Sequence, residues 1–450
     1  MAPTDANRLT FDDTLFETMR RALDTPVVSQ TVWRFSQALD PDALGRFHRG
    51  LARGPLNRVL RRSCVPAARS RWVHGSGVLP LTVADEVSDV LAWVGAQAMT
   101  RLDPESGPTW ALAYAPVAEG GSVLSFVTSH VVADGSLKLL ALEAAAAGEL
   151  LPVLPCDDPA AMRSGLHTDV SDALRQIGAA ARALPGLVRR RRTTGATPTA
   201  PSPPPPPVPE RDDDVPWTPP VVVVDLLAAD WERAAAEDGG TANVLLLAIC
   251  AELAASVGRA KPRQTIRLAS PLSTRTPGDL RSNASTGVSI EVVLDDAGRV
   301  GSLGRLRASA RAAYAAVQDQ DPAADPLAAA RALLPLLPDA LVRRLAPSWP
   351  APLVLASNLG ALSPTLVAPT GTAASSVLNR SITPPTSRGA ARRTRAGLSA
   401  WWGTAGPTAT LCVAGADPDA FPDVATLQAH LDRVLAARGL TGTTWRGHPG

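Results

Sequence analysis

The chain has 450 residues, with 44 lysines and arginines against 42 aspartates and glutamates, and a formal net charge of +2. Single cores stop growing near roughly 250–300 residues, so this length predicts two or three domains. The hydrophobic share of 45% is that of a globular protein, and the near-neutral charge gives no reason to expect a nucleic-acid partner.

The beginning of the chain and its apolar stretches bear on localisation. The segment MAPTDANRLTFDD is polar and acidic and lacks the apolar run of a signal peptide. No stretch reaches the ~18 uncharged apolar residues of a transmembrane helix. The longest one, 244–257, contains Glu252 and suits a buried helix better. We therefore expect a cytoplasmic protein, with peripheral membrane contact left open.

The four cysteines are far apart and form no CxxC pair; they are Cys64, Cys156, Cys250 and Cys412. Such spacing argues against a disulfide framework and against a structural zinc site, and it favours a reducing compartment. We expect no bound metal.

The first half of the chain contains a hairpin followed by a helix. Residues 110–116 and 122–129 have the composition of strands, and Gly120-Gly121 between them is a hairpin signal. Residues 137–150 are rich in Ala and Leu and predict a helix.

One segment interrupts this pattern. From 189 to 220 the chain runs through RRRR and then through five consecutive prolines, Pro203 to Pro207, which cannot continue a helix or join a central strand. We interpret it as an interdomain linker between lobes at 1–188 and 221–450. The alternative for the prolines is a ligand for a proline-binding module. Arg189–Arg192 fit a solvated helix end, and the alternative is contact with anionic lipid or a phosphorylated substrate.

The second half alternates strands with helices, which predicts a mixed α/β lobe. We expect strands at 220–226, 265–270, 288–294, 353–357 and 409–415, and helices at 231–237, 242–257 and 424–438.

His130 stands apart from the other histidines because it follows an apolar strand, SVLSFVTS, and opens the segment HVVADG just before a helix. Sites in α/β folds lie at such strand ends. In the spacing His130-x-x-x-Asp134-Gly135, the aspartate would hold the loop through an ion pair, and the glycine would permit an unusual backbone conformation. The imidazole would then act as a general base. The alternative is a hydrogen-bonded histidine beside an aspartate that merely caps the helix.

This loop and its surroundings resemble the acyltransferase superfamily whose signature is HHxxxDG. The superfamily includes condensation domains of peptide synthetases, polyketide-associated acyltransferases and bacterial wax ester synthase/diacylglycerol acyltransferases. The last group is the one that the chain is most similar to, over nearly its whole length. The similar segments are FDDTLF at 11–16, RWV at 71–73, TANVL at 241–245, PLSTR at 271–275 and SNLG at 357–360.

The resemblance implies a two-lobed, coenzyme A-dependent acyltransferase-like α/β fold, each lobe a mixed sheet with helices, and an active-site tunnel between the lobes. His130 would take the proton from an alcohol as it attacks a thioester on coenzyme A or on a carrier protein. This thioester is a co-substrate, and no bound cofactor is implied. Asp134 would be structural, with Arg275 as its ion-pair partner, although an ordinary surface arginine is the alternative.

The resemblance also implies a donor that stabilises the developing oxyanion. Asn358, or a backbone N–H near Gly135, is the candidate. For Asn358, a Ser-Asn-Leu-Gly turn is the alternative explanation of the motif.

The chain departs from the signature at its first histidine, which is Ser129 here. Val244 replaces an aspartate, and SNLGA lacks a proline, so we expect a divergent member. Two alternatives follow. One is a free-standing condensation-type enzyme that forms an amide on an amine acceptor. The other is a retired acyltransferase fold that binds lipid or a partner without chemistry, which Ser129 favours.

Overall fold

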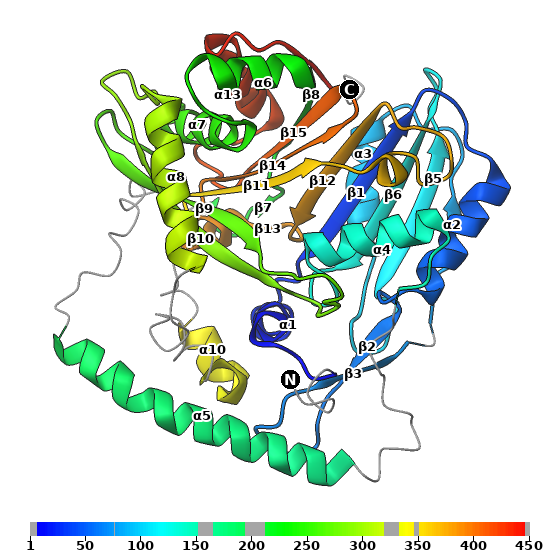
Figure 1. Ribbon diagram of the computed structural model, residues 1–450, viewed down its shortest axis with the longest axis vertical. Coiled ribbons are helices and arrows are strands. Elements are labelled where there is room, and N and C mark those ends of the chain that lie inside the picture. Colours follow the sequence, from blue (N-terminus) through cyan, green and yellow to red (C-terminus); the bar gives the residue numbers. More distant parts are fainter. Residues whose placement is uncertain are drawn as a thin grey trace.

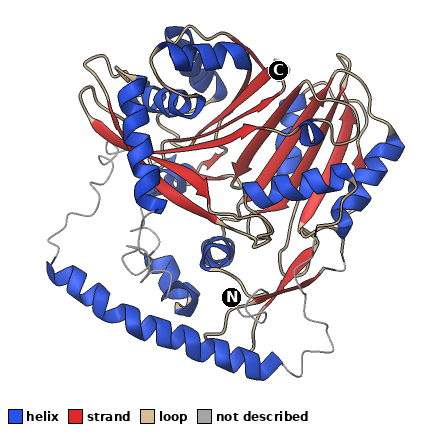
Figure 2. Ribbon diagram, viewed as in Figure 1, coloured by secondary structure: helices blue, strands red, loops and turns tan. Residues whose placement is uncertain are grey.

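The computed structural model describes residues 7–75, 77–151, 165–193, 212–318, 333–345 and 351–445. Two mixed β-sheets with flanking helices lie side by side, which confirms the predicted α/β fold of two lobes (Figures 1 and 2). The expected polyproline run, at 203–207, lies outside the described residues, so the boundaries of the expected linker remain a prediction.

The first lobe is built on a five-stranded sheet. Its order is β12 (Ser376–Ile382), β1 (Val28–Phe35), β6 (Ser122–Ser129), β5 (Trp110–Pro116) and β4 (Thr82–Val83). The pairs are antiparallel except for β4 with β5.

Alternate side chains of this sheet serve two layers because successive residues of a strand point to opposite faces. Trp33, Leu124 and Phe126 pack with α2 (Pro41–Arg53) and α4 (Gly135–Ala147). Val32 and Val123 pack on the other face, with α3 (Val90–Ala98) and residues of the second sheet. Figure 1 shows α4 in front of the strands and α3 behind them.

The predicted hairpin between β5 and β6 is present, with Pro116 opposite Ser122. Gly121 has a φ of +82°, and a Cβ there would lie 2.2 Å from the carbonyl oxygen of Phe35. The turn therefore needs glycine both for its backbone conformation and because the end of strand β1 lies too close to leave room for a side chain.

The second lobe is built on a seven-stranded sheet. Its order is β10 (Ser285–Val293), β9 (Thr265–Ser273), β11 (Val354–Ala361), β14 (Leu398–Ala405), β15 (Thr408–Gly415), β8 (Val221–Leu227) and β16 (Gly442–Thr444). The helices α6 (Ala228–Glu237), α7 (Ala242–Ser256), α8 (Leu303–Gln318) and α13 (Val424–Ala437) pack against it.

The helix α7 is the centre of this lobe, because every residue from Val244 to Ala254 is buried. Thr241 caps it by accepting a hydrogen bond from the backbone N–H of Val244. Within the described residues, no single helix is long and apolar enough to cross a bilayer. Among the described helices, one pair, α6 and α7, is long and apolar enough when the two are taken together, and it is bent by 82°.

The lobes share a strand. Strand β12 comes from the C-terminal half of the chain, yet it pairs with β1 of the first lobe from Val28↔Ile382 to Arg34↔Ser376. A buried cluster that includes Val32, Leu378, Trp401 and Cys412 fills the layer between the sheets. The lobes are therefore joined through both backbone pairing and a common core.

Shorter elements complete the fold. They are α1 (Phe11–Leu23), β2 (Arg58–Arg61), β3 (Arg71–His74), α5 (Gly165–Thr193), β7 (Pro216–Trp217), η5 (Leu334–Leu336), α10 (Asp339–Leu345), α11 (Pro364–Val367), β13 (Thr386–Ser387) and α12 (Arg388–Thr394).

Candidate active site

His130 lies in the short loop between β6, which ends at Ser129, and α4, which begins at Gly135. Its backbone N–H donates to the carbonyl of Val27, 2.9 Å away, so the loop is hydrogen-bonded to the residue that precedes β1. The imidazole is partly buried and stacks on the ring of Phe16 from α1, with the ring centroids 3.9 Å apart. The ring plane is therefore fixed by α1.

The second lobe fixes the proton on the ring. Asn283, which lies just before β10, has its Oδ1 atom 3.1 Å from Nδ1 of His130. The Nδ2 atom of Asn283 lies within hydrogen-bond distance of three acceptors: Oδ1 of Asp13 at 2.9 Å and the carbonyls of His130 and Val131 at 3.1 and 3.3 Å. Three acceptors identify that atom as the amide nitrogen. Oδ1 therefore accepts, and Nδ1 of His130 carries the hydrogen.

Asp13 holds Asn283 in this orientation. One of its carboxylate oxygens accepts from both the backbone N–H and the side-chain amide of Asn283, each at 2.9 Å. Asp13 itself belongs to a capping box with Thr10 at the start of α1. Burial raises the pKa of Asp13, and its hydrogen bonds from Asn283 and Thr10 act in the opposite direction.

Burial also lowers the pKa of His130 below its ordinary value of 6.5, although the charge of Asp134 and the hydrogen bond to Asn283 oppose the shift. The ring is therefore neutral at pH 7. With the hydrogen on Nδ1, the lone pair is on Nε2, and Nε2 makes no hydrogen bond within the described part of the chain. Such an imidazole is ready to accept a proton.

Asp134 binds elements of both lobes at once. As N-cap of α4 it accepts from the N–H of Leu137 at 2.7 Å. The same Oδ1 accepts from the guanidinium of Arg275 at 2.9 Å, and Oδ2 accepts from the N–H of Ala284 at 2.8 Å. The ion pair expected between Asp134 and Arg275 is thus present, and each side chain is only 5% exposed. The capping role given as its alternative is present as well.

Arg275 is not a surface residue. Its guanidinium also donates to the carbonyls of Asp279 and Arg281, at 2.7 and 2.9 Å. The backbone N–H of Asp134 in turn donates to the carbonyl of Ser282. The loop between β9 and β10 is in this way folded against the loop that carries His130.

Gly135 does not have the unusual backbone conformation that we expected. It is the first residue of α4, and it is absent from the glycines with positive φ among the described residues. A Cβ at this position would lie 3.7 Å from Cδ2 of Leu359, which is ordinary van der Waals contact. The expectation was wrong because the helix begins at Gly135 itself, so an ordinary helical conformation is sufficient.

Ser129 is the last residue of β6 and is 5% exposed. Its backbone N–H donates to the carbonyl of Thr109, and its own carbonyl accepts from the N–H groups of Val132 and Ala133. The position where the resembling family has a histidine is therefore part of the strand end that shapes the loop.

Asn358 lies in β11 at an irregularity of the pairing with β14. Its Oδ1 accepts from the N–H of Gly360 at 2.7 Å, and Gly360 has a φ of +72°. The Ser-Asn-Leu-Gly turn that was the alternative explanation of the motif is therefore present, and the side-chain oxygen of Asn358 is used in it. The adjacent Leu359 reaches Gly135, so the segment lies against the start of α4.

Arg58 was not predicted from the sequence, yet it links the two loops. It is 1% exposed, and its guanidinium donates to the carbonyl of Val132 at 3.0 Å and to Oγ of Ser282 at 2.8 Å. The group also lies over the ring of Trp72, 4.8 Å from its centroid. A buried arginine between an HxxxD loop and a distant serine leaves no local pattern in the sequence.

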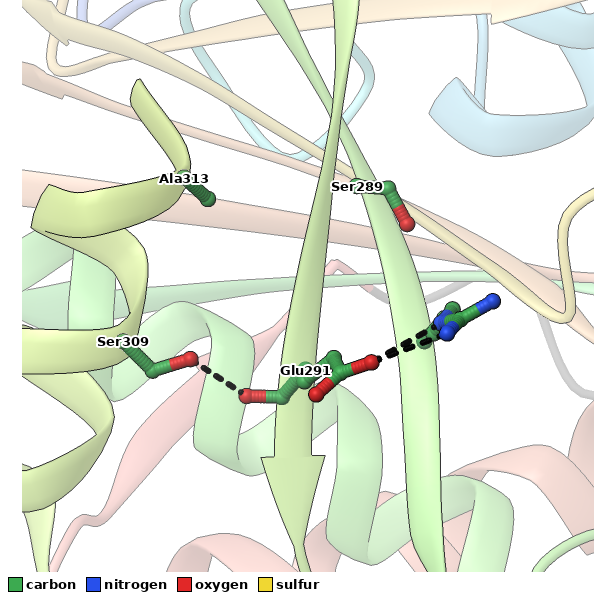
Figure 3. Close-up of a pocket in the computed structure, with 5 residues that line it drawn as sticks. Ser289, Glu291, Ser309 and Ala313 are labelled. Carbon is green, nitrogen blue, oxygen red and sulfur yellow. Dashed lines mark hydrogen bonds and ion pairs between the residues drawn. The ribbon is translucent and has the colours of Figure 1, made fainter. Parts of the chain in front are cut away.

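A hollow of about 460 Å³ lies elsewhere, on the surface formed by β9, β10 and α8 (Figure 3). Arg267 and Glu291 form an exposed ion pair across it, 3.0 Å apart, and Ser309 donates to the carbonyl of Glu291. None of the residues predicted from the sequence lines it. In the described ranges, no three His, Cys, Asp or Glu side chains form a group that could hold a metal ion.

Comparison with solved structures identifies the fold. The first condensation domain of the calcium-dependent antibiotic synthetase is similar over 96% of this chain and 95% of its own, with a TM-score of 0.59 and 15% identity. The condensation domain of the monacolin K polyketide synthase MokA covers 96% of each chain, with a TM-score of 0.55 and 13% identity.

A third similar structure is a variant of the starter condensation domain of rhizomide synthetase RzmA in complex with C8-CoA, with a TM-score of 0.54 and 15% identity over 96% of this chain and 94% of that one. No family model matches the chain, and no curated protein matches it in sequence. The chain therefore has the two-lobed fold of condensation domains.

Proposed function

We propose that this protein is an acyltransferase that moves an acyl group from an acyl thioester to an alcohol, with His130 as the general base. The observation that carries the proposal is the state of His130: Nδ1 is bound by Asn283, and Nε2 is left as the proton acceptor. The resemblance of the sequence to wax ester synthase/diacylglycerol acyltransferases favours an alcohol as acceptor.

In the proposed step, Nε2 of His130 takes the proton of the acceptor hydroxyl as its oxygen attacks the thioester carbonyl. The tetrahedral intermediate then collapses with loss of the thiolate, and the imidazolium returns its proton to the sulfur. An ester and a free thiol result. A general base of this kind contributes about 10²–10⁴ to the rate.

The first turn of α4 is our candidate for binding the oxyanion. The N–H groups of Gly135 and Ser136 donate to no other group in the described ranges, whereas the next one, of Leu137, is taken by Asp134. Free N–H groups at a helix start carry partial positive charge and favour an anion. Asn358 is a second candidate, because its Oδ1 accepts from the N–H of Gly360 and its Nδ2 is the atom that could donate to the oxyanion.

The donor that we propose is acyl-coenzyme A, with an acyl carrier protein as the alternative carrier. The starter condensation domain of rhizomide synthetase, which shares this fold, is described in complex with C8-CoA. The tunnel between the lobes that the donor would use, and the wax ester synthase-like assignment, are likewise proposals.

The test is thioester consumption by the purified protein. Acyl-coenzyme A donors of short to long chain are offered with a panel of alcohols and amines, and His130→Ala is run beside the wild type. We expect turnover with alcohols that falls about 10²-fold or more in the variant. Product analysis separates an ester from the amide that a condensation-type enzyme would form.

A second candidate is a binding protein that has lost catalysis, and Ser129 favours it because it replaces the first histidine of the signature. If neither wild type nor His130→Ala consumes thioester above the buffer background while both still bind acyl ligands, this candidate is established and the first is refuted.

A further inference from the structure

The helix α5, 29 residues from Gly165 to Thr193, lies at the lower edge of the molecule, away from both sheets (Figure 1). One face of it is attached to the first lobe. Asp169 pairs with Arg71 at 2.5 Å, and Asp172 pairs with Arg69 at 2.7 Å. The two carboxylates are 7% and 0% exposed, so this face is buried.

The opposite face is apolar and open. Leu166, Val170, Leu174 and Ile177 are 60%, 44%, 65% and 51% exposed. Their spacings of four, four and three residues place them on one side of a helix. Single exposed apolar residues are common, but a continuous stripe of large ones marks an interaction surface.

The charged residues of α5 are distributed unevenly along the helix. Its acidic residues, Asp169 and Asp172, are those bound to the lobe. Arg182 is exposed, and the backbone of the helix continues through the run Arg189–Arg192 before it ends at Thr193. The helix therefore has an exposed apolar stripe in its N-terminal half, and the charged residues in the sequence of its C-terminal half are all arginines.

This combination fits an anionic lipid surface better than a second protein copy. Helices that lie in a membrane interface place an apolar face at the acyl boundary and basic residues near lipid phosphates. The stripe from Leu166 to Ile177 spans on the order of 16 Å. Its four side chains are few beside the roughly 20–30 residues that each partner contributes to a stable protein interface.

We propose that α5 is a membrane-docking helix, which lays the stripe formed by Leu166, Val170, Leu174 and Ile177 into the surface of an anionic bilayer. This inference does not depend on the proposed acyl transfer, because vesicle binding is measured without any thioester.

The test is sedimentation of the full-length protein with vesicles made of equal parts phosphatidylcholine and phosphatidylglycerol, and with vesicles of phosphatidylcholine alone. We expect binding to the first, weakened by added salt, and little binding to the second. The double variant Leu174→Glu, Ile177→Glu should lower binding about tenfold or more.

The matched control is the double variant Leu227→Glu, Val424→Glu. These apolar residues are 61% and 51% exposed on the second lobe, so the variant adds the same charge away from α5. It should bind anionic vesicles like the wild type, and all three proteins should unfold at similar temperatures.

A second variant tests the basic end, with Arg189, Arg190, Arg191 and Arg192 all changed to Gln. It should also lose about tenfold or more of its binding to anionic vesicles.

Three results would overturn the proposal. They are failure of the wild type to sediment with anionic vesicles, equal binding by the α5 double variant, and a wild-type dimer that the α5 double variant dissociates while neither protein binds vesicles. The last result would assign the stripe to a second copy of the chain.

Discussion

At the scale of single residues, the base of the candidate site depends on side chains that are distant in the sequence. Phe16 fixes the plane of the His130 ring, and Asn283 fixes its protonated nitrogen. Asp13 in turn fixes the orientation of Asn283. Because the three partners come from α1 and from the loop before β10, the state of one imidazole depends on both lobes.

Asn283→Ala should lower kcat about 10–100-fold without a comparable change in KM, because the ring loses the acceptor that keeps its hydrogen on Nδ1. The hydrogen bond that His130 donates to Asn283 raises the pKa of His130, so its loss lowers that pKa further. The base is active when neutral, and the acidic limb of the pH–rate profile should therefore move to lower pH.

The control for this variant is Asn57→Ala, which removes another amide donor bonded to a backbone carbonyl, that of Ala52. It should leave kcat and the pH profile unchanged. An Asn283→Ala enzyme with the wild-type kcat and profile would refute the positioning role.

Arg275→Met should lower the free energy of unfolding by about 3–5 kcal/mol, because it leaves the carboxylate of Asp134 buried without its cation. Arg263→Met is the matched control. Arg263 also pairs with an aspartate, Asp296, but the two side chains are 79% and 71% exposed, so this variant should change the free energy of unfolding far less than Arg275→Met does. Urea denaturation measures both.

Adding Asp134→Asn to Arg275→Met should recover part of the lost stability, because the unpaired charge is then absent. If Arg275→Met costs no more than Arg263→Met, the ion pair does not hold the two loops together.

At the scale of elements, α4 and β12 meet around a buried lysine. Lys138, one turn after Asp134, is 1% exposed and donates to the carbonyl of Gln30 and to Oδ1 of Asn379, each at 3.1 Å. The same oxygen of Asn379 accepts from the hydroxyl of Thr31. A helix of the first lobe, its strand β1 and the strand from the other half of the chain are thus joined at one amine.

Burial lowers the pKa of Lys138 from 10.5 to about 7. Between these values the unfolded chain keeps the proton of the amine and the folded chain loses it. The unfolded state therefore binds more protons, and the free energy of unfolding should rise with pH, by up to about 1.4 kcal/mol per pH unit.

Lys138→Met should abolish this rise and, at pH 7, stabilise the protein by about 1–4 kcal/mol, since a buried amine is costly to desolvate. Lys261→Met is the control, because Lys261 is exposed, and it should keep the wild-type pH dependence. The measurement is urea denaturation at a series of pH values from 7 to about 10. If the free energy of unfolding of Lys138→Met rises with pH as steeply as that of the wild type, Lys138 is not the group whose pKa is lowered by folding.

The loop of His130 was predictable because the signal is contiguous. An apolar strand, a polar residue and a helix start follow one another within a few positions, and β6 and α4 are present there. The role of Gly135 could not be predicted from the sequence. A glycine in a motif does not indicate whether the fold needs its backbone conformation or its lack of a side chain.

Asn283 and strand β12 illustrate what the sequence alone does not reveal. The spacing of Asn283 from Arg275 carries no meaning until β9 and β10 fold back on the first lobe. The sequence of strand β12 does not indicate which sheet it joins, since the same alternation of apolar and polar residues would allow it to pair within the C-terminal half of the chain. Both depend on long-range pairing.

At the scale of the whole molecule, the two lobes form one unit with one site between their loops. The shared strand β12 and the buried layer around Val32 and Trp401 resist separation of the sheets. The loops of His130 and Arg275 are held together by Arg58 and by the Asp134 ion pair. Every step assigned to His130 depends on this assembly to keep its ring neutral, with Nε2 as the acceptor.

The most direct test is a pH titration of the protein labelled with ¹⁵N-histidine, in which the resonances of His130 are identified by their loss in His130→Ala. We expect hydrogen on Nδ1 of His130, none on Nε2, and a pKa below 6.5. Hydrogen on Nε2, or a pKa above 6.5, would contradict this expectation.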